Sequence, residues 1–226
     1  MNTARLERLA PWSGVVFVVL FIVSAALLPF DFLDDPDSLA SSFADDMGRY
    51  LGAAQVGVIA GAALLWFCGT LASALRTNGA GYRLAGIARG GGVAAATLLI
   101  AGAAVLVAGA LRADEDGSIA PETATAEADV GLLLIAAAMP VAAAVMVGAT
   151  ALAALRTRRI LPTWLAWVSV VLTVALLILP INFIALVVFV AWVLFVSVLM
   201  IIGRLEFADS EVATAVVVNE TVIIES

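Results

Sequence analysis

The sequence predicts an all-α fold: a polytopic membrane helix bundle with six transmembrane helices. Composition is the first reason, because 64% of the 226 residues are hydrophobic and 13% are charged. The mean hydropathy of +1.13 is far above the values of soluble domains. The second reason is that five charge-free runs are each long enough to cross a bilayer: Leu9–Phe30, Tyr50–Leu75, Gly90–Leu111, Val130–Leu155 and Ile160–Gly203.

The last run, Ile160–Gly203, is twice as long as one span requires. As a single helix it would measure about 66 Å, against about 30 Å for the hydrocarbon core of a bilayer. Its centre contains Pro180 and Asn182, which disfavour a continuous helix and tolerate a turn. We therefore predict a helical hairpin whose ends, at Arg159 and Arg204, lie on the same side of the membrane.

The predicted transmembrane domain covers residues 1–203, and a cytoplasmic tail, 204–226, is expected to be poorly ordered. Its six spans cover residues of about 12–30, 50–75, 90–111, 130–155, 162–180 and 183–203. A cleaved signal peptide is the alternative for the first span. Its apolar run is longer than the usual 7–15 residues, so an uncleaved span is favoured.

Arginine placement predicts the orientation. With the N-terminus inside, nine of the eleven arginines lie on the cytoplasmic side, and only Arg49 and Arg112 lie outside. Four tryptophans fall near the same boundary, where an aromatic belt is expected: Trp12, Trp66, Trp164 and Trp167. We predict a multi-pass protein of the cell inner membrane with both termini in the cytoplasm.

The two predicted outer loops hold twelve of the eighteen acidic residues. In the first, Asp31–Arg49, Pro36 can start a short helix that places Phe43 and Met47 on one face. Arg49 follows Asp45 and Asp46 by four and three residues, which is typical of a local ion pair. The second, Arg112–Asp129, is expected to be a loop with turn residues.

Small residues predict which spans pack most closely. The second span has Ala53, Gly57 and Gly61 at four-residue spacing, and the third and fourth have similar pairs. We expect spans two to four to form the packed centre, with the first, fifth and sixth more exposed to lipid. Pro140 should kink the fourth span or loosen a turn. Gly90-Gly91-Gly92 is interpreted as a flexible start of the third span.

The sequence offers little for catalysis. It contains no His and no Lys, so an imidazole base, a His metal ligand and a Schiff-base lysine are all excluded. The single Cys68 lies in an apolar run, where a thiol is usually inert. We predict no enzyme activity, no catalytic residue and no cofactor.

Two weak candidate sites remain. Four aspartates of the first outer loop could gather a divalent cation, although a solvated acidic loop is favoured: Asp31, Asp34, Asp35 and Asp37. Gln55 is a polar residue inside the second span, and its amide needs hydrogen-bond partners. A bond between helices is favoured over contact with a ligand.

Several short patterns resemble a group of uncharacterised actinobacterial-type multi-spanning membrane proteins, a family with a domain of unknown function. They are Leu64-Leu65-Trp66-Phe67 with Leu75-Arg76, the cluster Gly90-Gly91-Gly92, and Leu161-Pro162-Thr163-Trp164-Leu165-Ala166-Trp167. The resemblance covers most of Trp12–Gly203 and supports the topology. It implies no catalytic residues.

These observations favour a non-catalytic structural or partner-binding membrane subunit. The expected partners are membrane lipids and either another membrane protein or further copies of the chain, through the small-residue faces, with no nucleic acid. The alternative is a transporter or channel for a small neutral or hydrophobic solute. A water-lined cavity among spans two to four would favour transport, and a solid bundle would favour partner binding.

Overall fold

The structure, a computed structural model, describes residues 10–28, 36–116, 119–157, 161–178 and 182–202, and all its regular elements within these ranges are helices. Four stretches are long and apolar enough to cross a membrane: Met47–Thr77, Gly81–Arg112, Pro121–Thr157 and Ile184–Ile201. Such helices are typical of a membrane-embedded protein. The helices α2 (Trp12–Leu27) and α8 (Thr163–Leu177) are also apolar but shorter.

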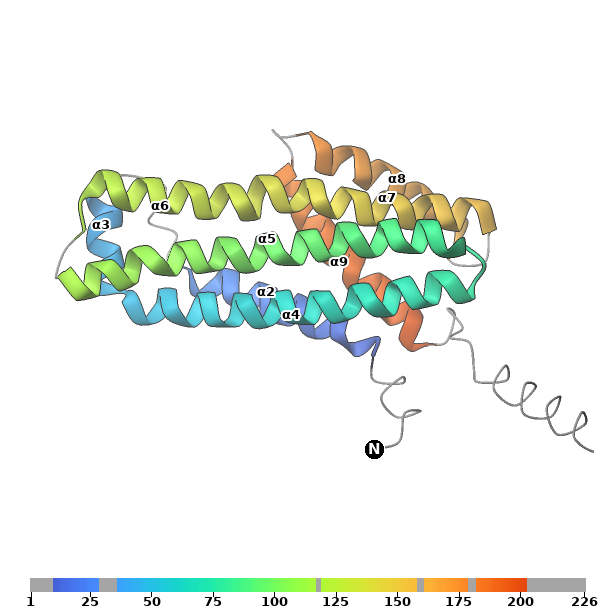
Figure 1. Cartoon of the computed structure of the whole chain (residues 1–226), viewed down its shortest axis with the longest axis horizontal. Helices are drawn as coiled ribbons and strands as arrows, with labels where there is room; N and C mark the ends of the chain where they lie inside the picture. Colours follow the sequence, from blue (N-terminus) through green and yellow to red (C-terminus); the bar gives the residue numbers. More distant parts are fainter. Residues whose placement is uncertain (1–9, 29–35, 117–118, 158–160, 179–181, 203–226) are drawn as a thin grey trace, which may run out of the picture.

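Three long helical segments lie side by side along the molecule (Figure 1). They are α4 (Met47–Thr77), α5 (Gly81–Asp116) and a third segment made of α6 (Pro121–Leu133), η2 (Leu134–Ala138) and α7 (Met139–Thr157). At about 1.5 Å per residue, their lengths are about 46, 54 and 55 Å. They exceed the ~30 Å of a bilayer core, so they have room to extend beyond it.

The turn from α4 to α5 is built on glycine. Gly79 and Gly81 have φ angles of 83° and 78°, which side chains disfavour. The side-chain Nδ2 of Asn78 donates to the carbonyl oxygen of Ala74 at 2.8 Å and helps to cap the end of α4. This end of the bundle, called the basic end, carries four exposed arginines: Arg76, Arg83, Arg89 and Arg156.

The opposite end, called the acidic end, is covered by α3 (Pro36–Asp45), which lies across the ends of the long helices (Figure 1). Leu39 and Phe43 of α3 are buried in a small second core, and Met47 packs against it. The predicted short helix is confirmed, but Phe43 and Met47 do not share a face of it, because α3 ends at Asp45 and Met47 begins α4. The other buried members of this core are Tyr50, Leu106, Ala110, Ala124 and Ala128.

The predicted loop Arg112–Asp129 is wrong. Helix α5 continues to Asp116, and α6 begins at Pro121, so the segment is mainly helical. Proline suits the first helical position because it has no N–H to leave unpaired. The absence of an apolar run had suggested a loop, but Ala124 and Ala128 give α6 a narrow buried face.

Small residues do bring the long helices together. A Cβ atom added at Gly57 would lie 3.1 Å from Ser24 Oγ of α2. One added at Gly61 would lie 2.5 Å from Ile100 Cγ1 of α5. The interpretation of Gly90-Gly91-Gly92 as a flexible start is wrong, because α5 is continuous from Gly81 and Gly91 is buried against α7.

Pro140 loosens its helix as predicted. The five residues of η2, directly before Met139 and Pro140, form a π-helical turn. The proline ring would clash with the carbonyl of Ala136 in a regular helix, and a widened turn relieves this clash.

Helices α8 and α9 (Asn182–Ile201) form the predicted antiparallel pair. Trp192 Nε1 donates to Ser169 Oγ at 2.8 Å, and the rings of Trp164 and Phe195 lie 5.5 Å apart. Pro180 itself lies outside the described residues. The expectation that the sixth span is more exposed to lipid than the central spans is wrong. Of the residues in Ile184–Ile201 of α9, 56% are buried, the same share as in the most apolar part of α4.

Candidate functional site

The acidic residues proposed as a cation site are only partly placed. Asp31, Asp34 and Asp35 lie outside the described residues, as does the side chain of Asp37 in α3. Within the described part of the chain, no three His, Cys, Asp or Glu residues are grouped to hold a metal ion. The cation site therefore stays a prediction.

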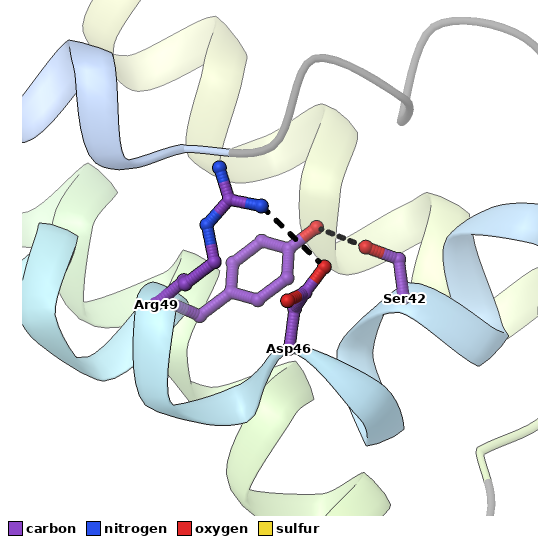
Figure 2. A network of polar contacts seen from close by, with 4 residues as sticks. Ser42, Asp46 and Arg49 are labelled. Atoms are coloured by element: carbon purple, nitrogen blue, oxygen red, sulfur yellow. Dashed lines mark hydrogen bonds and ion pairs between the residues drawn. The ribbon is translucent and has the colours of Figure 1, made fainter.

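The junction between α3 and α4 holds a polar network (Figure 2). The hydroxyl groups of Ser42 and Tyr50 are 3.2 Å apart, and Arg49 Nη1 lies 3.7 Å from Asp46 Oδ2. The Asp46–Arg49 pair confirms the ion pair predicted from spacing. It is solvent-exposed, so it contributes little to stability. The network links the end of α3 to the first turn of α4.

An aromatic contact connects α3 to α4. The rings of Phe43 and Tyr50 lie 4.7 Å apart at 67°, an edge-to-face arrangement. Phe43 is fully buried, and Tyr50 is 2% exposed. This pair anchors α3 to the start of α4.

A second ion pair, between Arg112 and Glu127, links α5 to α6. Arg112 Nη1 donates to Glu127 Oε1 at 2.5 Å. Glu127 Oε2 is buried without a hydrogen-bond partner, and a Cβ atom added at Gly109 would lie 2.6 Å from it. Sequence reasoning missed this pair because it treated both residues as loop. The available signal was that Arg112 is the only base in the acidic segment 112–129.

Gln55 lies on the exposed side of α4, and within the described residues its amide makes no hydrogen bond to another helix, so the predicted bond between helices is not found in the single chain. One residue pair fixes its depth: Ser24 Oγ of α2 donates to the carbonyl oxygen of Ala53 at 2.7 Å. Ser24 lies within α2, three residues before the end of that helix. Gln55 follows Ala53 by two residues in α4, so it lies at a height that α2, an apolar helix, also covers. Gln55 therefore faces the surroundings of the bundle within its apolar zone.

Buried polar side chains in the bundle interior form hydrogen bonds within the chain. Thr150 and Ser197 are fully buried, and each donates to the carbonyl oxygen four residues earlier at 2.8 Å. Ser169 donates to Leu165 O at 2.7 Å and accepts from Trp192. These groups need no ligand to satisfy them.

A small cavity lies between α2, α4 and α5. Its volume is about 20 Å³, and its lining is mainly apolar, with Ser24 and Tyr50 as the polar members. A space of this size holds about one water molecule. It is too small for a solute.

An open apolar hollow of about 380 Å³ lies between α2 and α4. Trp12 and Trp66 border it, and their side chains are 49% and 61% exposed. Ile59 and Ala62 of α4 also line it. It is a surface feature, open to lipid or to another protein.

The small-residue positions of the second and fourth spans are largely occupied within the chain. Gly57 and Gly61 contact α2 and α5, and Gly148 lies against Thr173 of α8. Ala104 of the third span is exposed, so association through the small-residue faces stays a prediction. Comparison of the chain with known protein families, characterised proteins and solved structures finds no match, so the resemblance to actinobacterial membrane proteins stays a prediction.

Proposed function

We propose that this chain is a non-catalytic structural or partner-binding subunit of the cell membrane. In this proposal α2, α4, α5, the α6–α7 segment, α8 and α9 are the six spans, and both termini lie in the cytoplasm. The basic end would then face the cytoplasm and the acidic end would face outward. The exposed arginines at one end and the acids at the other support this orientation.

The packed interior is the observation that carries the proposal. Cys68 and Met146 are buried where α4, α5 and α7 meet, and the separate cavity between α2, α4 and α5 is only about 20 Å³. A transporter needs polar groups that bind its solute and a path through the bundle. The polar groups described inside this bundle are already hydrogen bonded, which favours partner binding over transport.

Photo-crosslinking in native membranes tests the proposal. A photoreactive residue is placed at one exposed position on each spanning helix: Val19, Ile59, Val93, Val145, Val171 and Val187. We expect one helix face to give a protein adduct of discrete mass and the other faces to give lipid adducts. Lipid adducts at all six positions would contradict partner binding.

Water accessibility of the interior tests the transport alternative. Ala103 is 5% exposed and lines the small cavity, whereas Ala120 is exposed at the acidic end. In a Cys68→Ser background, Ala120→Cys should react with a small charged thiol reagent and Ala103→Cys should not. Reaction at Ala103 together with lipid-only crosslinking would support a transporter instead.

A further inference from the structure

One side of α4 carries an apolar stripe with a single amide in it. The residues of this α4 stripe are spaced three or four apart, so they share one helix face, and all five are exposed: Leu51, Gln55, Ile59, Ala62 and Trp66. Its residues carry no charge. The hollow between α2 and α4 lies along the half of the α4 stripe nearer the basic end, beside Ile59 and Trp66.

Gln55 is an unusual residue to present to lipid. Its amide has two donor hydrogens and one acceptor oxygen. The hydrocarbon layer supplies no partner for them, and an unpaired amide there is costly. Thr97 offers a contrast, because it is exposed on α5 but its hydroxyl donates to Val93 O of its own helix at 2.9 Å.

We propose that the α4 stripe binds a second copy of this chain, with the two Gln55 amides hydrogen bonded to each other. This inference rests on the proposed function and names its partner. Around a two-fold axis along the membrane normal, each residue of α4 meets its own copy at the same depth. A glutamine amide is complementary to itself, since its oxygen accepts from the NH₂ of the other. No other partner is guaranteed to place both a donor and an acceptor at this depth.

The surroundings of Gln55 suit such a contact. Leu51 and Ile59, one turn to either side, are 36% and 46% exposed and would supply apolar packing. The hollow between α2 and α4 can receive side chains from the second copy. Arg49 is paired with Asp46, so the start of α4 carries no isolated cation toward the contact.

Disulfide trapping in native membranes tests the geometry. In a Cys68→Ser background, Gln55→Cys should form a covalent dimer on mild oxidation, because the two residues meet at the axis. Val145→Cys, an exposed position on α7, is the matched control and should stay monomeric. A dimer through Val145 and none through Gln55 would overturn the proposal.

Energy transfer between labelled copies in lipid vesicles tests the amide. Gln55→Leu should weaken dimerisation about three- to tenfold, in line with hydrogen bonds between membrane helices. Thr97→Val, which also removes a lipid-facing polar group, should leave dimerisation unchanged. The melting temperature of the monomer should be equal in both variants, which excludes misfolding as the cause.

Two further outcomes separate this inference from the proposed function. A crosslink from Ile59 to a protein of another mass would overturn the self-association and keep the partner-binding role. Equal energy transfer for Gln55→Leu and the natural chain would show that the amide pair does not form. Absence of any protein crosslink would overturn both.

Discussion

Two neighbouring glycines in α5 show how much the surroundings of one residue matter. A Cβ atom added at Gly91 would lie 2.6 Å from Met146 N and 2.9 Å from Ala142 O, both backbone atoms of α7. A Cβ atom added at Gly90 would meet nothing within 4 Å. The first glycine sets the distance between two helices, and the second has no packing role in the described structure.

Gly91→Ala should therefore lower the free energy of unfolding. The backbone of α7 cannot move aside as a side chain can, and overpacking of this kind costs about 1–3 kcal/mol. Gly90→Ala is the matched control, and it should be neutral or stabilise by up to about 1 kcal/mol through helix propensity. Thermal unfolding in nanodiscs measures both. Equal melting temperatures would contradict the close approach of α5 and α7.

The Arg112–Glu127 pair allows an asymmetric prediction. The Glu127 side chain is only 16% exposed, whereas the Arg112 side chain is 60% exposed. Arg112→Leu leaves a largely buried carboxylate without its cation and should cost about 1–3 kcal/mol. Glu127→Leu leaves an arginine in water and removes the unpaired Oε2 atom, so it should cost less. Thermal unfolding that ranks the variants in the reverse order would contradict this burial.

At the scale of elements, apolar runs predicted the helices well where the sequence is strongly apolar. The α8–α9 pair and the loosened turn at Pro140, both within apolar runs, are confirmed. The short helix from Pro36 is also confirmed, although it was predicted from the proline and lies in an acidic segment. The start of α6 was missed because its buried face consists of Ala124 and Ala128 among acids. Alanine gives little hydrophobic signal, and only contact with α3 and α5 shows why this segment is helical.

The candidate site was harder to predict than the fold. Gln55 was recognised from its polarity. Its exposure depends on how α2 and α5 pack around α4, and the spacing of residues along the sequence does not show this packing. The Arg112–Glu127 pair joins the end of α5 to α6, two helical segments that the sequence suggested were parts of one loop. Contacts between elements, which no local pattern encodes, decide both.

Helix α3 should undock as a unit when its anchor is removed. Phe43→Ala loses a fully buried ring and its contact with Tyr50, a change that costs about 3–5 kcal/mol. A ten-residue helix is not stable alone, so it should unfold once released. Hydrogen exchange should rise throughout α3 and stay slow in the middle of α5. Asp45→Asn, an exposed change in the same helix, should leave exchange unaltered; rapid exchange there too would contradict the anchoring role.

For the whole molecule, charge is separated along the bundle axis. Exposed arginines gather at the turn between α4 and α5, and acidic side chains gather around α3 and α6. This separation predicts an orientation, although helix length and composition alone cannot tell one face of a membrane from the other.

Impermeant thiol labelling on intact cells tests that orientation. In a Cys68→Ser background, Glu122→Cys at the acidic end should label from outside. Tyr82→Cys, whose natural side chain is 84% exposed at the basic end, should label only after the membrane is opened. Labelling of Tyr82→Cys on intact cells would reverse the proposed topology.

The apolar height of the bundle is unequal around its perimeter, and this has a consequence for the lipid. Helix α8 is about 23 Å long, α2 and the stripe from Leu51 to Trp66 are each about 24 Å, and α9 is about 30 Å. Where a bilayer of about 30 Å meets the shorter helices, either the bilayer must become thinner or the protein must tilt. Each ångström of mismatch has a modest elastic cost. Two copies that join along α2 and α4 would remove that strained lipid from between them. The bilayer itself would then favour the association that the Gln55 amides orient, and it would do so more strongly in thicker membranes.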